Sequence, residues 1–262
     1  MLRSISRVSR RSLNNLVPAE HVETAENLIS TCEKIVEKHV NPNIETWEKE
    51  QKMPLHHIFK KFGEAGLLGI SHPEKAGGFG LPYAVNLAVA ESYGQFMDHG
   101  SLPMCLGVQT DMATPALAEH GNEHLVENYL KPAIQGDMVS CIGVSEPHAG
   151  SDVSEIKSTA RLSDCGKYYI INGGKIWTTN VTQADWMCML VNTEADKGKY
   201  QNKSLIVVPL NSEGITISTK DMEKLGQKAS DWGQTYRKFE KIKNYDFIHK
   251  IHNRNFLFIW KT

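Results

Sequence analysis

The hydrophobic pattern changes its period near residue 137, and this change restricts the chain to a helical segment followed by a segment of strands. Between Glu20 and Gly136, apolar residues recur at three- and four-residue steps, which places them on one side of a helix. From Met138 onward they come in short runs bounded by turn residues, as is typical of strands. We therefore expect an α+β protein, with an N-terminal α-helical domain followed by an antiparallel β-barrel or sandwich domain.

Five helices are expected in the first segment. They cover residues 22–39, 55–65, 82–96, 104–119 and 123–134. Asn41-Pro42 ends the first helix, because the residue before a proline is disfavoured in helical conformation. The third is apolar on nearly every side, as expected of a helix buried among others. His120-Gly121-Asn122 separates the last two, since glycine favours the end of a helix.

Strands are expected in the second segment. They cover residues 138–144, 168–171, 175–179, 186–191, 205–210 and 215–218. Asn172-Gly173 lies between the second and third of these, and Asn-Gly is the strongest short signal for a hairpin turn. The sequence therefore predicts a hairpin there.

Composition excludes several classes of protein. The 262 residues include 29 Lys and Arg against 30 Asp and Glu, so no global charge favours nucleic acid. The five cysteines form no Cys-x-x-Cys pair, which argues against a disulfide framework and for a reducing compartment. The longest apolar run, 186–191, is far shorter than the roughly 20 residues that cross a bilayer, so no transmembrane segment is expected.

Residues 1–18 have the composition of a targeting leader. They contain four arginines and no acidic residue, with apolar residues interspersed. Mitochondrial transit peptides share this basic, acid-poor, amphipathic character, whereas the alternative is a frayed basic tail. We expect a transit peptide and a location in the mitochondrial matrix.

Two segments match catalytic motifs in whole or in part but lack the local structure that each motif requires. His120-Gly121-Asn122-Glu123-His124 matches the His-x-x-Glu-His zinc pattern, but that pattern needs one continuous helix, which Gly121-Asn122 interrupts. Gly143-Val144-Ser145-Glu146-Pro147 begins like a nucleophile elbow and has proline where the second glycine belongs. We expect neither a metal site nor a hydrolase.

Two further segments have the chemistry to hold a ligand. Residues 143–153 leave a strand and combine a proline with small residues and hydroxyls, which lets backbone N–H groups approach a ligand closely. Residues 175–180 place Trp177 and two threonines on a strand, where an indole and hydroxyls could contact a flavin or nucleotide ring. Local chemistry leaves the plain alternatives open, a tight connection and a half-buried strand.

Three motifs stand in and after these segments: Val-Ser-Glu-Pro-x-Ala-Gly-Ser-Asp-Val at 144–153, Asn-Gly-x-Lys-x-Trp-x-Thr-Asn at 172–180 and Lys-Leu-Gly-x-x-Ala-Ser-Asp at 224–231. Together they resemble the acyl-CoA dehydrogenase family. Residues 66–70 and 73–80 are similar to the family's N-terminal helical domain. The stretches 182–188 and 202–206 look most like the citronellyl-CoA or long-chain branch.

The resemblance implies a domain order and a reaction. Residues 19–136 would form the N-terminal helical domain and 137–231 the middle β domain that binds FAD and acyl-CoA. Family members remove a proton and a hydride from the α and β carbons of an acyl-CoA, which gives a trans-2-enoyl-CoA, and pass the electrons to an electron-transferring flavoprotein. Full-length relatives are homo-oligomers.

The resemblance also implies eight cofactor-binding positions. They are Ile142, Val144, Ser145, Gly150, Ser151, Trp177, Thr178 and Thr179. The first three would hold the pyrimidine edge of the flavin, the next two would lie beside the pyrophosphate and the CoA portion, and Trp177 with Thr179 would bracket the dimethylbenzene and N5 side. Ser151 is also the expected substrate contact. Ser145 stands where the family usually has threonine, and His148 where it commonly has glycine or asparagine.

The chain departs from the family after Asp231. There the family continues with a strand and a C-terminal four-helix domain that carries the glutamate base, and no such continuation is recognisable, so we assign no catalytic base. Residues 232–262 hold seven basic, two acidic and eight aromatic residues. Such an atypical tail could bind a membrane surface or nucleic acid. We favour a non-native end produced by splicing or a gene-model error.

Two functions are therefore carried forward. The first is an FAD-dependent acyl-CoA dehydrogenase of fatty-acid or branched-chain catabolism, with this truncated chain itself expected to be inactive. The second is a catalytically inactive module that binds FAD or acyl-CoA, or a partner protein.

Overall fold

The computed structural model describes residues 16–194, 197–219, 224–243 and 247–250, and for 236–243 and 247–250 it describes the backbone only. Nearly all of the predicted leader and the last residues of the tail lie outside this part of the chain. The chain forms two compact units. The first comprises residues 1–107, 134–137 and 224–230, and the second 108–133, 138–223 and 231–262. Each unit is described by itself.

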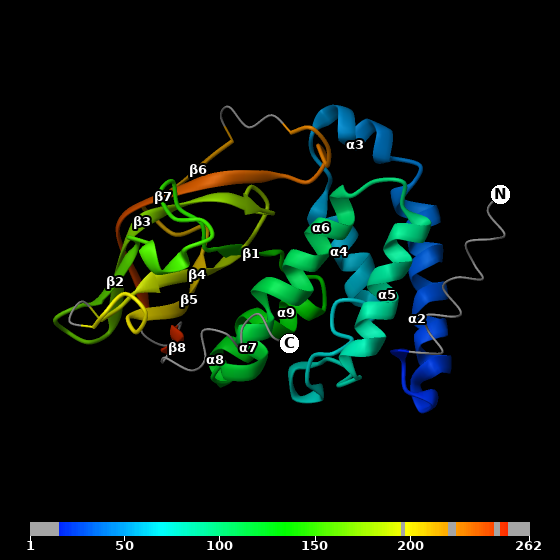
Figure 1. Ribbon diagram of the computed structural model, residues 1–262, viewed down its shortest axis with the longest axis horizontal. Helices are drawn as coiled ribbons and strands as arrows, with labels where there is room; N and C mark the ends of the chain where they lie inside the picture. Colours follow the sequence, from blue (N-terminus) through cyan, green and yellow to red (C-terminus); the bar gives the residue numbers. More distant parts are fainter. Residues whose placement is uncertain (1–15, 195–196, 220–223, 244–246, 251–262) are drawn as a thin grey trace. The chain divides into compact units, whose positions relative to one another are not determined.

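The first unit is built from helices (Figure 1). They are α2 (Val22–Ile35), α3 (Ile44–Glu50), α4 (Leu55–Glu64), α5 (Tyr83–Phe96) and α6 (Ser101–Gly107). A π-helical turn, Val36–Val40, continues α2 to the predicted stop. The buried residues of α2 are Ala25, Leu28 and Cys32, which are spaced by three and four residues as the periodicity predicts. Helix α3 was not predicted from the sequence.

Helix α5 differs from its expected environment. The sequence predicts burial on nearly every side, and Val85, Val89 and Tyr93 are indeed buried. Leu87, however, is 48% exposed and Tyr83 is 40% exposed. One side of this apolar helix therefore faces solvent, because the apolar composition of a helix does not by itself supply a neighbour on every side.

The second unit begins with short helical pieces. They are a π-helical turn Val108–Ala113, α7 (Pro115–His120), α8 (Glu123–Leu125), a π-helical turn Val126–Leu130 and α9 (Lys131–Ile134). The single helix predicted over 104–119 is wrong, because Pro115 starts a new helix. The predicted stop at Gly121-Asn122 is confirmed: α7 ends at His120, and the Asn122 side chain accepts the Leu125 N–H at 2.9 Å. Among the described residues, no helix is both long and apolar enough to span a membrane.

The rest of the second unit is one sheet in the strand order β6-β7-β3-β2-β4-β5-β8, with β1 paired to β4. The strands are β1 (Ser140–Gly143), β2 (Thr159–Leu162), β3 (Tyr168–Thr179), β4 (Trp186–Asn192), β5 (Lys203–Pro209), β6 (Ile215–Ser218), β7 (Trp232–Lys243) and β8 (Phe247–Lys250). The β1·β4 and β2·β4 pairings are parallel, so the sheet is mixed rather than wholly antiparallel. Strand β2 was not predicted.

Strand β3 corrects the predicted hairpin. Asn172-Gly173 lies within one 12-residue strand that pairs with β2 on one edge and β7 on the other. Gly173 has a φ of +147°, and a Cβ built there would lie 2.3 Å from Ser158 Oγ. Glycine serves here as a close-approach position in a strand, rather than as a turn residue.

Strand β7 corrects the expectation that no family strand follows Asp231. It begins at Trp232 and pairs antiparallel with both β3 and β6. The basic and aromatic composition of residues 232–262 concealed the strand, because charged residues interrupt the apolar alternation from Arg237 onward.

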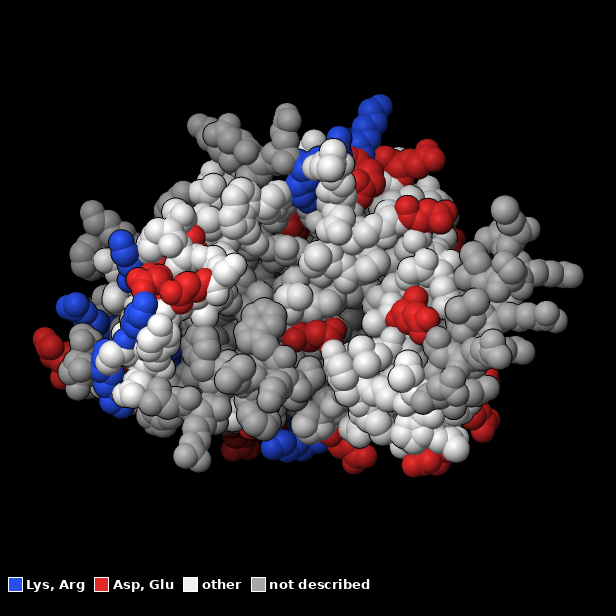
Figure 2. Space-filling view, in the orientation of Figure 1, with Lys and Arg blue, Asp and Glu red and all other residues white. Residues whose placement is uncertain are grey.

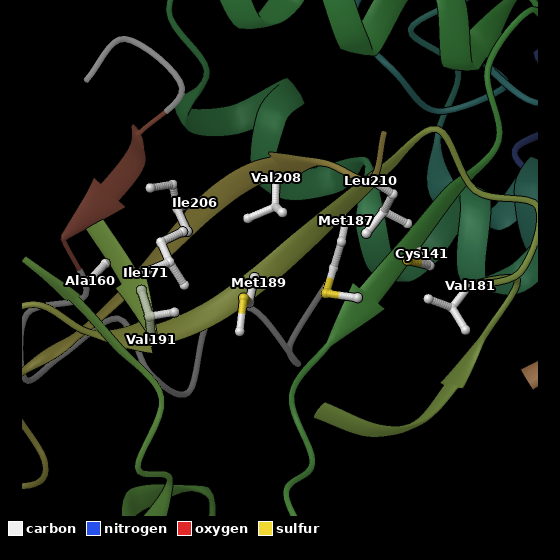
Figure 3. Close-up of a cluster of buried hydrophobic side chains, with 10 residues drawn as sticks. All are labelled: Cys141, Ala160, Ile171, Val181, Met187, Met189, Val191, Ile206, Val208 and Leu210. Carbon is white, nitrogen blue, oxygen red and sulfur yellow. The ribbon is translucent and has the colours of Figure 1, made fainter. Parts of the chain in front are cut away.

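The sheet core is a continuous cluster of buried apolar side chains (Figure 3). Its members are Cys141, Ala160, Ile171, Val181, Met187, Met189, Val191, Ile206, Val208 and Leu210. They come from β1, β2, β3, β4, β5 and the segments that follow β3 and β5, so the cluster joins the first five strands of the sheet. Burial of each large apolar side chain contributes about 1.5–3 kcal/mol.

Gly173→Ala is expected to destabilise the sheet unit by about 2 kcal/mol or more, because the new Cβ would collide with Ser158 in a backbone conformation that alanine avoids. Urea unfolding followed by circular dichroism measures the change. Gly198→Ala is the control, since a Cβ there meets nothing within 4 Å. Equal stabilities of the two variants would contradict the role given to Gly173.

Candidate functional site

The turn after β1 lies beside the Trp177 segment of β3. Strand β1 is held in parallel by β4, so Val144 and Ser145 emerge from the sheet at its end. The Ser145 carbonyl accepts the Ile176 N–H at 2.9 Å. This backbone contact joins the two segments that the sequence singled out, although they are distant along the chain.

A β-bulge turns Trp177 out of the strand. Lys175 pairs with Thr235 and Thr178 with Gly233, so β3 has one residue more than β7 between these pairs. Trp177 has a φ of +58°, a left-handed conformation that an L-residue with a bulky side chain rarely adopts. Trp177 is 54% exposed. Bulges commonly redirect a side chain next to a functional site, and strain of this kind clusters there.

Trp232 packs against Trp177. The two ring centroids lie 4.8 Å apart at an interplanar angle of 35°. Trp232 is the first residue of β7, on the strand that pairs with β3. Trp232 is the first residue of the predicted atypical tail, so this contact was not expected from the sequence.

The predicted cofactor-binding residues differ in exposure. Ile142, Val144, Ser145 and Thr179 are partly buried, whereas Gly150 and Ser151 are exposed. Thr178 is 1% exposed, and its Oγ1 has no hydrogen-bond partner in the described part of the chain. The Ser145 backbone is thus held against Ile176, the residue before Trp177, while the Thr178 side chain is buried away from solvent.

A buried ion pair, Glu146 with Lys175, is the feature of this site that sequence reasoning missed. Lys175 is 0% exposed and Glu146 4% exposed, with Lys175 Nζ 2.8 Å from Glu146 Oε1. Lys175 also donates to the Val144 carbonyl at 3.0 Å. The spacing of Lys175 could have indicated its burial. In one continuous strand it shares a face with the core residue Ile171, four residues earlier, and a buried lysine needs a partner of opposite charge.

The Glu146 carboxylate is fully engaged. Besides Lys175, it accepts the Lys157 N–H at 2.7 Å and the Ser158 N–H at 3.1 Å. His148 Nε2 lies 3.5 Å from Glu146 Oε2. Glu146 is therefore a structural anchor of the turn and a poor candidate for a catalytic base.

Burial and charge act against each other in this pair. Burial lowers the pKa of Lys175 to about 8, although Glu146 acts in the opposite direction. Burial alone would raise the pKa of Glu146, but the Lys175 ammonium and the hydrogen bonds from residues 157 and 158 outweigh it and leave that pKa below its ordinary value. Each partner therefore favours the charged form of the other, against the desolvation that burial imposes on both.

Charged residues of both signs surround the exposed Gly150–Ser151 turn. Asp152 accepts the Ser154 N–H at 3.0 Å and so caps the helical turn Val153–Glu155, and this hydrogen bonding lowers the pKa of Asp152. Lys199 pairs with Glu155 and lies 4.0 Å from Asp152. Figure 2 shows the same intermingling of Lys, Arg, Asp and Glu on one face of the sheet unit.

The zinc-like pattern forms no ligand cluster. His120 ends α7 and His124 lies in α8, beyond the break at Gly121-Asn122. Within the described ranges, no group of three His, Cys, Asp or Glu side chains could hold a metal ion.

The class defined by these observations is an α+β protein whose sheet unit presents a polar turn beside a bulged tryptophan. Two family models match the sequence: the acyl-CoA dehydrogenase N-terminal domain over residues 22–137 and the middle domain over 141–239. The chain therefore belongs to the acyl-CoA dehydrogenase family. The second match extends past Asp231 into β7.

Individual relatives agree with this assignment. The chain is 29% identical to the mitochondrial isovaleryl-CoA dehydrogenase of Pongo abelii over 86% of its own length and 53% of that protein. It is 32% identical to the mitochondrial short-chain specific acyl-CoA dehydrogenase of Rattus norvegicus, over 79% of the chain and 49% of that protein. The chain thus spans about half the length of these relatives. Its membership of the citronellyl-CoA or long-chain branch stays a prediction.

Solved structures show the same fold. The crystal structure of acyl-CoA dehydrogenase from Geobacillus kaustophilus superposes with a TM-score of 0.81 at 28% identity, covering 94% of this chain and 62% of that one. A structure described as the electron transferring flavoprotein of Acidaminococcus fermentans gives a TM-score of 0.78 at 26% identity, covering 86% of this chain and 58% of that one.

Glu146→Gln tests the ion pair through pH. The folded-state pKa of Glu146 is lower than its ordinary 4.5, so its contribution to stability is present above pH 4.5 and is lost as the pH falls through the folded-state value. The variant is expected to be less stable than the wild type by about 3 kcal/mol near neutral pH, because one partner of a buried pair is removed. The difference should shrink in acid.

Urea titrations at neutral pH and at acid pH measure this difference. Glu155→Gln is the control, because it removes a carboxylate from a largely exposed pair with Lys199 and should cost about 0–1 kcal/mol. A Glu146→Gln deficit of the same size at every pH would show that charge pairing is not what the carboxylate contributes.

Proposed function

We propose that this protein acts in the FAD-dependent dehydrogenation of an acyl-CoA thioester to a trans-2-enoyl-CoA. The observation that carries the proposal is the hydrogen bond between Ser145 and Ile176, which sets the polar turn beside the bulged Trp177. Family membership supplies the reaction class. The acyl chain length and branching are set aside, because the named relatives act on different acyl groups.

The residues present fit a flavin. Val144 and Ser145 offer backbone groups and a hydroxyl for a polar ring edge, and Trp177 offers a largely exposed indole for the ring system. A Cβ at Gly150 would meet nothing within 4 Å, so the neighbouring turn is open to a bulky group such as a pyrophosphate, and the exposed Ser151 hydroxyl suits the CoA portion. When bound, the flavin supplies an acceptor for the hydride that leaves the acyl β-carbon.

The donors around such a ring would favour its reduced form. Hydrogen-bond donors held in advance near a group that gains charge stabilise that charge without reorganisation. Thr179 and Ser145 are expected to supply the donors on the two sides of the ring. We assign no residue of this chain as the base that removes the α-proton, since Glu146 is occupied by Lys175 and two backbone N–H groups.

The proposal includes partners and a location. An electron-transferring flavoprotein would accept the electrons, assembly into a homo-oligomer would follow the full-length relatives, and the mitochondrial matrix suits the composition of residues 1–18. The word mitochondrial in the names of two relatives supports the location, although bacterial proteins also match.

Titration of the purified chain with FAD tests the cofactor proposal. We expect weak binding that Trp177→Ala weakens a further tenfold, equivalent to about 1.4 kcal/mol, because the exposed indole is removed. Flavin fluorescence measures the affinity. Tyr200→Ala is the control, since Tyr200 is another exposed aromatic of the same unit, at 63% exposure. Equal losses in the two variants would contradict the assigned site.

Dye reduction with acyl-CoA separates the two functional readings. Little or no turnover is expected from this chain, since it supplies no assigned base, and bound FAD without turnover would favour the binding module. Robust acyl-CoA oxidation would show that the chain contains a catalytic base, which would contradict the expectation of an inactive chain.

A further inference from the structure

The Glu146–Lys175 pair lies next to the proposed flavin contacts without being one of them. Glu146 directly follows Ser145, and Lys175 precedes Trp177 by two residues. Both charged groups are buried, so neither is expected to touch a ligand. Their position suggests an effect on the neighbouring residues.

Lys175 controls the direction of one peptide group. Its ammonium donates to the Val144 carbonyl at 3.0 Å. In a trans peptide the carbonyl and the following N–H point in opposite directions, so this bond directs the Ser145 N–H away from Lys175. Among the hydrogen bonds of the described residues, none has the Ser145 N–H as donor. The lysine thus holds a free backbone donor in a fixed direction.

Glu146 anchors the same turn to a third segment. Its carboxylate binds Lys175 and accepts the N–H groups of Lys157 and Ser158, just before β2. The pair therefore joins the turn, the segment just before β2 and the bulged part of β3. Stability of the fold alone does not explain the presence of this ion pair, because well-packed apolar residues can commonly replace a buried ion pair with no loss of stability. An apolar pair would not hold the Val144 carbonyl.

We propose that Glu146 and Lys175 are positioning residues, which orient the Val144–Ser145 peptide and hold the bulge that presents Trp177 to the flavin. This inference rests on the proposed function of these two segments. It assigns to the pair an effect on ligand affinity that is separate from its effect on folding.

The test compares Lys175→Met with the double variant Glu146→Gln/Lys175→Met. Lys175→Met leaves the buried Glu146 carboxylate without its cation. A weaker affinity for FAD in this variant could therefore come from lower stability of the fold or from a displaced Val144–Ser145 peptide. The double variant removes both charges and should regain most of the wild-type resistance to urea. A positioning role predicts that it still binds FAD at least tenfold more weakly than the wild type.

A second readout does not depend on FAD. The indoles of Trp177 and Trp232, 4.8 Å apart, should give a coupled pair of circular-dichroism bands, which Trp177→Phe identifies by its loss. The bands should be weakened in both Lys175 variants. They should be unchanged in Lys203→Met, the matched control, because Lys203 is also buried but donates to Lys199 and Asn202 instead.

The outcomes are distinguishable. Wild-type bands and wild-type FAD affinity in the folded double variant would overturn the inference and leave a purely structural pair. Failure of the wild type to bind FAD would count against the proposed function, while the indole bands would still show whether the pair positions Trp177. If Lys175→Met does not fold, the double variant carries the comparison alone.

Discussion

Pairing of β3 on both edges is the constraint on which the sheet unit depends. Strand β2 holds the first half of β3 and β7 holds nearly all of it. Two irregularities in the β7 pairing, one beside Gly173 and one at Trp177, let a long strand pass close to Ser158 and then turn an indole outward. Without β7 there would be no ladder against which Trp177 could bulge.

The site is organised by polar groups that do not face solvent. Glu146 and Lys175 are buried, and their hydrogen bonds are made with the backbone of Val144 and of the segment before β2. A buried ion pair contributes little net stability but demands one geometry, because an unpaired charge in that environment is costly. The same demand makes the pair suited to holding a ligand surface in place.

Much of the architecture could be predicted from local pattern. The helical stripe of α2 and the amphipathic α4 follow from periodicity. Strands β4, β5 and β6 follow from short apolar runs bounded by turn residues, and the stop at Gly121-Asn122 follows from turn chemistry. The hairpin at Asn172-Gly173 could not be excluded in this way. Its glycine is required by a contact with Ser158, which lies outside any local window.

The sequence alone determined the order of a helical and a β segment, and the motifs that mark the acyl-CoA dehydrogenase family. Only the tertiary structure decided that Trp177 turns outward against Trp232 and that Lys175 meets Glu146. The physical reason is that the register and bulges of a strand depend on the strands paired with it. Here β7 sets the register of β3, and β7 lies in a segment whose composition did not predict a strand.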